Sequence, residues 1–196
     1  MPHANFPNSV LSAQSTFRAI LDATARPGTV QPISGVVEAP QPLSSGAAAV
    51  ALTLCDHDTP VWIDTGLSAS APVSEWLRFY CGCPIVQNPR DAAFAFASEP
   101  KALPPFDAFN LGTADYPDRS TTIVLQVTSF EAGPRLALTG PGIRVRMSFR
   151  ADPLPADIVA RHTFNRGLFP RGIDLMLVTT NAVAALPRSV RIAEED

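Results

Sequence analysis

AAAVALTLCDHDTPVWID, residues 47–64, joins an apolar segment to a short β-type segment through an acidic turn. The first part is rich in Ala and apolar nearly all round, which predicts a buried helix that Ser44 or Ser45 can cap. Val61 to Asp64 then predicts a buried strand that carries a bulky aromatic side chain, Trp62. A helix followed directly by a strand is the repeating unit of α/β proteins, so this stretch sets the fold class.

The segments on either side continue this alternation. Upstream, a helix with Ser12 as its N-cap ends at Arg26-Pro27-Gly28, and a short strand over 29–33 follows. Downstream, Ser70 and Pro72 open a third helix, which Gly82 closes. The predicted buried stripes are Ala13, Phe17, Ile20, Leu21 and Thr24 in the first helix, and Val73, Trp76, Leu77 and Tyr80 in the third.

The second half of the chain supplies most of the predicted sheet. The β-branched run 122–127 is typical of a central buried strand, and 173–180 predicts a second one. Short strands are also expected over 85–86 and 92–97, and a hairpin joins 135–139 to 143–149 about Gly140-Pro141-Gly142. A helix is expected to start at Pro153 or Pro155, with one side formed by Leu154, Ile158, His162 and Asn165. A last, proline-interrupted strand is expected over 183–192. The expected fold is one domain over 1–196, a three-layer α/β/α arrangement around a mixed sheet.

Composition excludes several classes of function. Hydrophobic residues make up 46% of the chain and charged residues 17%, with a net charge of -3. This balance argues against a nucleic-acid-binding protein, which needs basic side chains for phosphate contacts. A surface with few charges suits a protein whose exterior is partly covered by partners. Lys101 is the single lysine, so a Schiff base could form nowhere else, and the sequence contains no G-x-x-x-x-G-K-[ST] phosphate loop.

The three cysteines, Cys55, Cys81 and Cys83, form no C-x-x-C motif. Cys81 and Cys83 are separated by one residue, which is too close for an ordinary disulfide. We therefore expect reduced thiols and a cytoplasmic protein. Residues 1–7 lack the basic and apolar regions of a signal peptide, and no apolar run reaches the length of a membrane span.

The turn Asp56-His57-Asp58 concentrates side chains that could bind a metal or transfer protons. Neighbouring residues of one loop seldom all point at one ion, so a metal site would need a distant ligand such as His162. His57 is also favoured at the end of a helix by the helix dipole, which explains the cluster without any chemistry. We predict no metal site and retain the three residues as candidates for ligand or interface contacts.

A cysteine nucleophile would need a histidine base, and two pairings are conceivable. Cys55 with His57 is weak because Cys55 falls on the buried helix face, where a thiol is inert. Cys83 with His162 has no support beyond residue type. The sequence has no G-x-S-x-G nucleophile motif, and Gly140-Pro141-Gly142 lacks the third glycine of a dinucleotide-binding loop and precedes a strand.

Arginines offer the alternative of anion binding. Arg144 and Arg146 alternate on one face of a predicted strand, where an exposed charged face is the stronger interpretation. Arg161 and Arg166 are expected on the solvated side of their helix.

Asp174 places a charge in an apolar strand and needs a partner, because an unpaired buried charge is costly. Arg171 or Arg188 could supply that partner. An internal ion pair that holds the strand end is favoured over a catalytic pair, and all three residues remain candidates for ligand or interface contacts.

Six segments occur in an order, and at a chain length, that characterise one family. They are Phe17-Arg18-Ala19-Ile20-Leu21 with Arg26-Pro27-Gly28, Asp56-His57-Asp58-Thr59-Pro60-Val61-Trp62, Leu77-Arg78-Phe79 with Cys83-Pro84, Leu138-Thr139-Gly140-Pro141-Gly142-Ile143, Phe169-Pro170-Arg171-Gly172-Ile173-Asp174-Leu175 and Ala185-Leu186-Pro187-Arg188. From about Ser12 to Ile192 the chain resembles PhnH, a subunit family of the bacterial carbon–phosphorus lyase complex. Thr24 departs from the pattern, which has a Met-like residue there, and we expect this change to affect core packing only.

The resemblance implies a fold similar to the large domain of pyridoxal-phosphate-dependent transferases, without their cofactor site and without a cofactor of its own. It also implies a homodimer that joins PhnG, PhnI and PhnJ in a core complex. Together with PhnG, PhnI and a nucleotide-binding-cassette protein, the family supports displacement of adenine from ATP by a phosphonate. The product is a ribose 1-phosphonate 5-triphosphate, which a radical iron–sulfur subunit later cleaves. The resemblance assigns no catalytic residue to this chain.

Three functions stay open at this point. The first is an accessory subunit that is enzymatically silent alone, which agrees with the low charge. The second is a stand-alone hydrolase or transferase that uses Asp56, His57 and Asp58 in a pocket with His162 or Arg171. The third is a binding module that holds a phosphonate or nucleotide through arginines, for which the candidates are Arg144, Arg146, Arg171 and Arg188.

Overall fold

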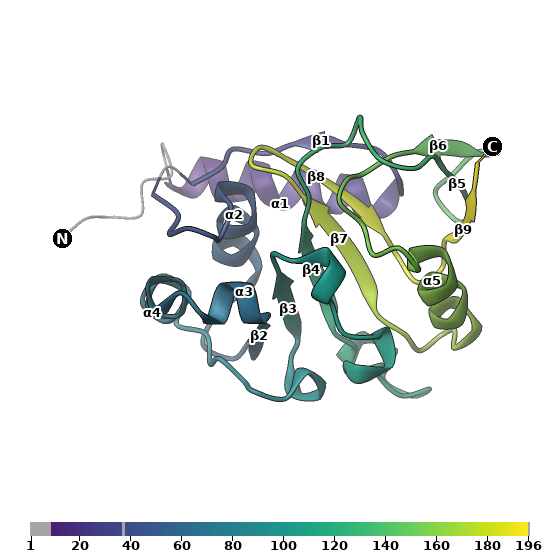
Figure 1. Cartoon of the computed structure of the whole chain (residues 1–196). Coiled ribbons are helices and arrows are strands. Elements are labelled where there is room, and N and C mark those ends of the chain that lie inside the picture. Colours follow the sequence, from purple (N-terminus) through teal and green to yellow (C-terminus); the bar gives the residue numbers. More distant parts are fainter. Residues whose placement is uncertain (1–8, 37, 196) are drawn as a thin grey trace.

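The computed structural model describes residues 9–36 and 38–195, so the N-terminal segment in which we expect no signal peptide lies outside the described residues. The chain folds around a six-stranded sheet with the order β1-β8-β7-β4-β3-β2 and a smaller three-stranded sheet, β6-β5-β9 (Figure 1). The helices are α1 (Ser9–Ala25), α2 (Ser45–Leu54), α3 (Thr65–Ser68), α4 (Ala71–Tyr80) and α5 (Ile158–Gly167). The strands are β1 (Gln31–Pro32), β2 (Val61–Ile63), β3 (Phe94–Ala97), β4 (Thr122–Gln126), β5 (Leu136–Thr139), β6 (Met147–Phe149), β7 (Asp174–Val178), β8 (Ala182–Leu186) and β9 (Arg191–Glu194).

The large sheet is mixed, as predicted. β2, β3, β4 and β7 are parallel neighbours, and β8 and β1 add two antiparallel strands at one side. β4 lies in the middle, and its residues Ile123, Val124 and Leu125 are fully buried. Val124 faces one core cluster while Ile123 and Leu125 face the other, which explains why a central strand reads as a continuous apolar run. The prediction of an α/β protein with a central strand at 122–127 is confirmed.

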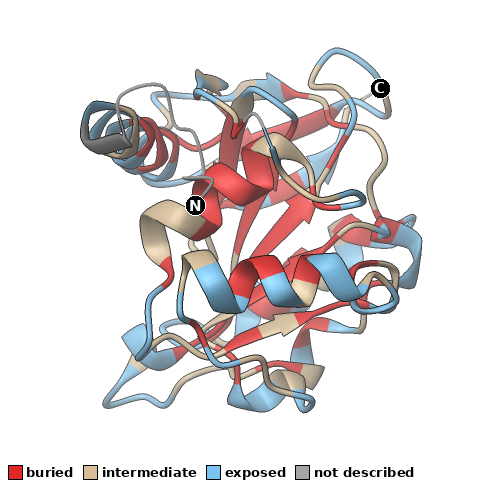
Figure 2. Ribbon diagram, turned by 90° about the vertical axis from the view of Figure 1, so that its left-hand side faces the viewer, coloured by how far each residue is buried: buried red, intermediate tan, exposed pale blue. Residues whose placement is uncertain are grey.

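Helices cover the first face of this sheet. α2 is buried from Gly46 to Ala51, and α4 buries Val73, Trp76 and Leu77 while its outer side stays in solvent (Figure 2). Small residues let α2 lie close to the sheet: a Cβ at Gly46 would stand 2.0 Å from the backbone oxygen of Thr179. Ser44 caps α2 by accepting a hydrogen bond from the Ala47 backbone N–H at 3.2 Å. The predicted buried helix and its cap are therefore confirmed.

The buried face of α1 differs from the prediction. The helix begins at Ser9, so Ser12 is not its N-cap, and Phe17 and Leu21 are 45% and 52% exposed. Ile20 is buried as predicted, and the other inward residues are small; α1 packs along α2 and β8. Large apolar side chains would hold the two helices apart, whereas small ones allow close packing. The residues that α1 buries are Thr16, Ala19, Ile20 and Ala23.

The second face is covered by α5, the three-stranded sheet and several single turns of 3-10 helix. The predicted hairpin is confirmed, because β5 and β6 pair antiparallel with Leu136 opposite Phe149. Its second strand begins at Met147 and not at Ile143. The predicted strand 183–192 divides at Pro187 into β8 and β9, which belong to different sheets. The outer layer on this face thus contains β strands that the three-layer α/β/α prediction lacked.

Smaller differences concern short elements. The predicted strand 85–86 is a single β-bridge from Ile85 to Val61. The helix predicted after Ser70 is confirmed as α4. Ser70 makes no side-chain cap there, because its hydroxyl donates to the Gln41 backbone oxygen at 3.0 Å. Within the described residues, no helix has both the length and the apolar character needed to cross a membrane.

Candidate functional site

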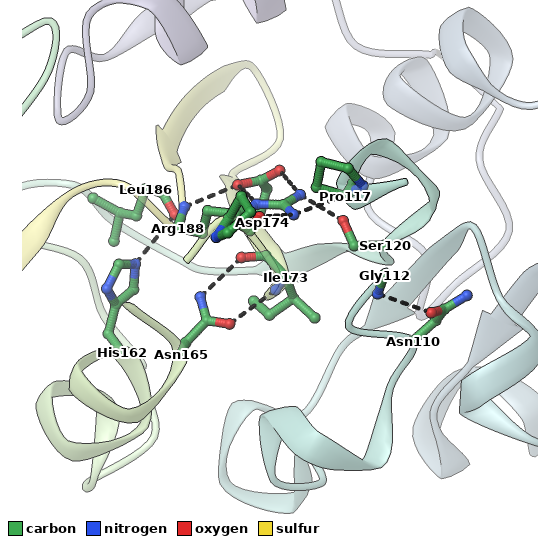
Figure 3. A network of polar contacts seen from close by, with 11 residues as sticks. Asn110, Gly112, Pro117, Ser120, His162, Asn165, Ile173, Asp174, Leu186 and Arg188 are labelled. Atoms are coloured by element: carbon green, nitrogen blue, oxygen red, sulfur yellow. Dashed lines mark hydrogen bonds and ion pairs between the residues drawn. The ribbon is translucent and has the colours of Figure 1, made fainter. Parts of the chain in front are cut away.

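Asp174 and Arg188 form the central contact of the site, as one of the two predicted pairings for Asp174 (Figure 3). Asp174 begins β7, and Arg188 follows β8, so the antiparallel pairing of these strands brings them together. The Arg188 Nη2 lies 2.5 Å from Asp174 Oδ2, its Nε lies 3.1 Å from Oδ1, and its backbone N–H donates to Oδ1 at 2.9 Å. This two-pronged geometry is the strong form of an ion pair. The Arg188 side chain is 13% exposed and that of Asp174 is 33% exposed.

Arg188 also fastens two loops to the start of β7. Its guanidinium donates to the backbone oxygens of Pro117 at 2.9 Å and Pro170 at 3.3 Å, and to the Ser120 hydroxyl at 2.5 Å. The guanidinium donors of Arg188 are thus used in bonds that hold the fold together. Arg171 is exposed, and its backbone N–H bonds to Leu168, so it does not serve as the partner of Asp174.

Two buried residues of α5 contact this part of the sheet: Asn165 holds the loop before β7, and His162 contacts the end of β8 (Figure 3). The Asn165 amide donates to the Ile173 oxygen at 2.9 Å and accepts from the Ile173 N–H at 2.8 Å. Gly172 has a φ of +121° and no room for a Cβ, which would stand 2.5 Å from Asn165 Oδ1. His162 Nε2 lies 3.3 Å from the Leu186 oxygen, whereas Nδ1 is buried with no hydrogen-bond partner. Burial lowers the pKa of His162, so its ring is neutral.

A small cavity of about 190 Å³ opens beside Asp174. Side chains from α1, the end of α2 and the start of the parallel strands line it, and most of these are apolar. Thr24 lies at this cavity and is exposed, so the residue at this position does not pack in the core as expected. The cavity is too small for a nucleotide and offers Asp174 as its one charged group.

The acidic turn lies in solvent and forms no pocket with the other candidates. Asp56 accepts hydrogen bonds from the Asp58 backbone N–H at 3.0 Å and from the Thr59 hydroxyl at 2.6 Å. The Thr59 bond is the main reason that the pKa of Asp56 is lowered. His57 Nε2 lies 3.2 Å from Asp58 Oδ2, but the two side chains are 80% and 85% exposed. An exposed pair of this kind orients nothing for catalysis and contributes little stability.

His162 does not join this turn. It contacts β8, whereas the turn precedes β2, and four strand spacings, or about 19 Å, separate those two strands. The pocket that a stand-alone enzyme would need is therefore not formed. Cys83 packs in the core on the helical face of the sheet, so the pairing of Cys83 with His162 is also wrong. Cys55 is buried as predicted, and burial raises the pKa of its thiol.

The arginines outside this network have varied roles. Arg144 and Arg146 lie before β6 and not on a strand, and Arg146 pairs with Glu195 at 3.0 Å. Arg161 is not on a solvated side as predicted. It pairs with Asp157 at 2.6 Å and its guanidinium donates to the oxygens of Leu103 and Pro104, both at 2.8 Å. Interactions with carbonyl groups of another loop leave no pattern in the sequence of the helix itself.

Arg166 is exposed as predicted and lines a shallow cavity of about 280 Å³ with Pro141, Phe169 and Ser189. Phe169 is 64% exposed, and Phe164 and Arg171 nearby in sequence are also exposed. We use the name aromatic–arginine surface for four exposed residues of the segment 164–171, of which Arg166 and Phe169 line the same cavity: Phe164, Arg166, Phe169 and Arg171. Exposed aromatic and arginine side chains are the types most enriched where proteins bind one another.

Two larger cavities lie at the opposite end of the large sheet, where its parallel strands end. One has a volume of about 510 Å³ and the other about 390 Å³, and both are lined by Ser44 and Thr180. The first is lined mainly by neutral polar and small groups, among them Gln41, Ser45 and Asn181. Such an edge is the usual ligand position in open α/β sheets. This position was not predicted from the sequence, although polar residues directly after three expected strands indicate it.

Asp64 stabilises this edge from the end of β2. It is 2% exposed, and its carboxylate accepts hydrogen bonds from the backbone N–H groups of Leu67, Ser98 and Glu99 at 2.9, 2.7 and 2.9 Å. These bonds cap α3 and join the ends of β2 and β3. All carboxylate acceptors are used within the fold, so the role of Asp64 is to position the edge.

The described residues provide few chemical groups for independent catalysis. Between residues 9 and 195, position 37 apart, no three His, Cys, Asp or Glu side chains come together as a metal ligand set. Arg188 and Asp174 neutralise each other, and the two large cavities hold hydroxyls and amides. The arrangement can bind a neutral polar group or another protein surface.

Comparisons with known proteins give the same family as the six sequence segments quoted above. The chain matches the family model described as bacterial phosphonate metabolism protein (PhnH) over residues 4–193. The alpha-D-ribose 1-methylphosphonate 5-triphosphate synthase subunit PhnH of Rhizobium meliloti (strain 1021) is 44% identical over 191 residues, which cover 97% of this chain and 94% of the relative. The putative C-P lyase subunit protein HtxG of Stutzerimonas stutzeri is 35% identical over 82 residues, or 42% of each chain. The chain therefore belongs to the PhnH family of bacterial phosphonate metabolism proteins.

Proposed function

We propose that this chain is an accessory subunit of a carbon–phosphorus lyase complex and has no independent catalytic activity. The observation that carries the proposal is the 44% identity, over nearly the whole of both chains, to a subunit of a ribose methylphosphonate triphosphate synthase. In that role the chain supports the formation of ribose 1-phosphonate 5-triphosphate from ATP and a phosphonate. The exposed acidic turn and the neutralised Asp174–Arg188 pair support a role without chemistry of its own.

The partners in this proposal are a second copy of the chain and the subunits PhnG, PhnI and PhnJ. We assign the partner contact to the aromatic–arginine surface, where Arg171 is the candidate from the sequence. Phe169 offers a large apolar side chain that loses water on contact, and the adjacent arginines suit carboxylates of a partner. Asp174 and Arg188 hold the loop that presents Phe169, so they act on this contact through position.

A co-purification experiment tests the assignment. The tagged chain is expressed with the other three subunits, and the double variant Phe169→Ser/Arg171→Glu is compared with Phe79→Ser/Arg78→Glu. The control pair lies on α4, where Phe79 is 72% exposed and Arg78 is also exposed, so both variants make the same change to solvent-facing side chains. We expect at least a ten-fold loss of captured subunits for the first variant and no loss for the control. Equal capture by both would move the contact elsewhere, and no capture by the unaltered chain would contradict the subunit role.

A ligand-binding module is the second candidate, because the 510 Å³ cavity has the size of a small-molecule site. Titration calorimetry with ATP and with methylphosphonate tests it, and the variant Gln41→Trp should fill the cavity and abolish any heat. Absence of heat at millimolar ligand would exclude binding by the isolated chain. A third measurement, adenine release from ATP and methylphosphonate without partner subunits, would reveal a stand-alone enzyme.

Two further features belong to the same proposal. We expect the fold to superimpose on the large domain of pyridoxal-phosphate-dependent transferases, and a crystal structure aligned with such a domain checks this. We also expect the protein to be located in the cytoplasm, because ATP, the substrate for synthesis of the triphosphate, is available there. Cell fractionation with detection of the tagged chain measures that location.

A further inference from the structure

The outer side of α1 carries large apolar side chains in contact with solvent. Leu11, Phe17 and Leu21 are all exposed, whereas the inward residues of this helix, apart from Ile20, are small. A helix on the surface of a monomer has the opposite distribution, with its large apolar side chains turned toward the core. The distribution in α1 is that of a helix with two packed faces, and the chain itself covers only the inward one.

The spacing of the exposed residues indicates a helix as the covering element. Five exposed positions of α1 recur at alternating intervals of three and four, which is the spacing of the contact line between two packed helices. They are Leu11, Gln14, Arg18, Leu21 and Ala25. Phe17 precedes Leu21 by one turn and widens this line on one side.

Two charged residues on the same side of α1 are complementary to each other. Arg18 is exposed and takes part in none of the ion pairs formed within residues 9–36 and 38–195. Asp22 lies one turn further along, but it pairs with Arg26 at 2.9 Å and its side chain remains 54% exposed. The helix thus presents a free guanidinium and a carboxylate that can accept a second cation.

Antiparallel packing of α1 against a second α1 uses both features at once. A two-fold axis midway between Phe17 and Leu21 sets each phenylalanine against the leucine of the other copy. An axis midway between Arg18 and Asp22 sets each arginine against the carboxylate of the other copy. The two midpoints are one residue, or about 1.5 Å, apart along the helix, so a single axis serves both pairs. In parallel packing, by contrast, Arg18 would face its own copy.

We propose that α1 is the contact between two copies of this chain, packed antiparallel about a two-fold axis at the level of residues 19–20. The assignment rests on the proposed function, in which a second copy is one of the partners. α1 packs into the core cluster on one face of the large sheet and α5 into the cluster on the other face. The self-contact and the α5 residues of the aromatic–arginine surface therefore lie on different sides of the sheet.

Sedimentation equilibrium of the full chain measures the dissociation constant of the dimer. Leu21→Glu places a charge in the apolar contact of both copies, and we expect the dissociation constant to rise at least ten-fold. Val145→Glu is the control, because Val145 is 80% exposed in the loop before β6 and lies outside α1. The control should leave the dissociation constant unchanged.

A mixing experiment tests the antiparallel register. Arg18→Asp sets carboxylates against each other across the axis, and Asp22→Arg does the same with guanidinium groups. Each variant alone should therefore dissociate with a constant at least five-fold higher than that of the unaltered chain. An equimolar mixture of the two variants restores both pairs of opposite charge in a mixed dimer, and its constant should return to within about two-fold of the unaltered value. A general loss of folding would not be repaired by mixing, and circular dichroism of each variant checks the fold.

Several results would overturn the proposal. A monomeric unaltered chain excludes the self-contact, a dimer that Leu21→Glu leaves intact places it elsewhere, and a mixture no tighter than the single variants contradicts the register. If Leu21→Glu leaves the dimer intact but lowers capture of the other three subunits, one of those subunits covers α1 instead. The proposed function fails separately: a chain that dimerises through α1 but captures no other subunit keeps the self-contact and loses the subunit role.

Discussion

Arg188 connects three parts of the chain at the scale of one side chain. It pairs with Asp174 and bonds to Pro117, Ser120 and Pro170, and its own side chain is nearly buried. Removing a partner from such a pair leaves a partly buried charge and several carbonyl groups without donors. We expect Arg188→Ala to lower the free energy of unfolding by about 2 kcal/mol, as measured by urea denaturation. Arg171→Ala changes an exposed arginine in the loop that Arg188 contacts through Pro170; it is the control and should stay within about 0.5 kcal/mol.

His162 predicts a pH dependence of stability. Its folded-state pKa is lowered by burial, so in the range below the ordinary value of about 6.5 the unfolded chain binds a proton that the folded chain does not. The contribution of neutral His162 to the free energy of unfolding is therefore fully present above pH 6.5 and is lost as the pH falls through that value. Urea denaturation should show a loss of about 1 kcal/mol between pH 7 and pH 5.5. The variant His162→Gln should lack this part of the slope, and the same slope in the variant would assign it to other groups.

Single residues also show what the sequence could predict. An ion pair of Asp174 was predictable because a charge in an apolar strand is costly without a partner. Arg188, one of the two arginines proposed, is that partner. Arg161 was placed on the wrong side because its partners are backbone oxygens of Leu103 and Pro104, which carry no residue-type signal. Asp64 looked like the end of a strand, and its bonds to backbone N–H groups from another strand are equally invisible in a sequence.

At the scale of elements, Asp64 holds two strand ends and a helix start together. An amide in its place presents an N–H₂ group to the Ser98 and Glu99 N–H donors or to that of Leu67, so at least one buried donor loses its acceptor. We expect Asp64→Asn to lower the free energy of unfolding by about 2 kcal/mol. Asp118→Asn, which changes an exposed carboxylate, is the matched control for the same urea titration. A loss equal to the control would mean that water can replace these bonds.

The elements themselves were predictable where burial is two-sided or periodic. The buried parts of β4 and α2 are continuous apolar runs, whereas α4 alternates because one side meets solvent. The helix α1 and the burial of Ile20 were predicted, but Phe17 and Leu21 are exposed because the other inward residues of α1 are small, and small residues give a weak periodic signal. β8 and β9 were merged because nothing local to Pro187 shows that the chain changes sheet there.

At the scale of the molecule, the acidic turn separates an assembly role from a catalytic one. His57 is exposed and lies beside Asp58, so its removal disturbs neither the core nor the Asp174–Arg188 network. We expect the complete complex with His57→Ala to release adenine from ATP and phosphonate at a rate within two-fold of the unaltered complex. A variant complex that assembles fully but has lost activity would restore a catalytic role for Asp56, His57 and Asp58.

Both borders of the large sheet are closed to further strands. β1 is two residues long and contains Pro32, which has no N–H to donate, and β2 already bonds to Pro84 and Val86 on its outer side. A border of this kind resists the edge-to-edge pairing by which many sheets continue from one molecule into the next. Contacts of another protein with these two borders would therefore depend on side chains, so that point substitutions there, and not backbone pairing, would decide which proteins bind.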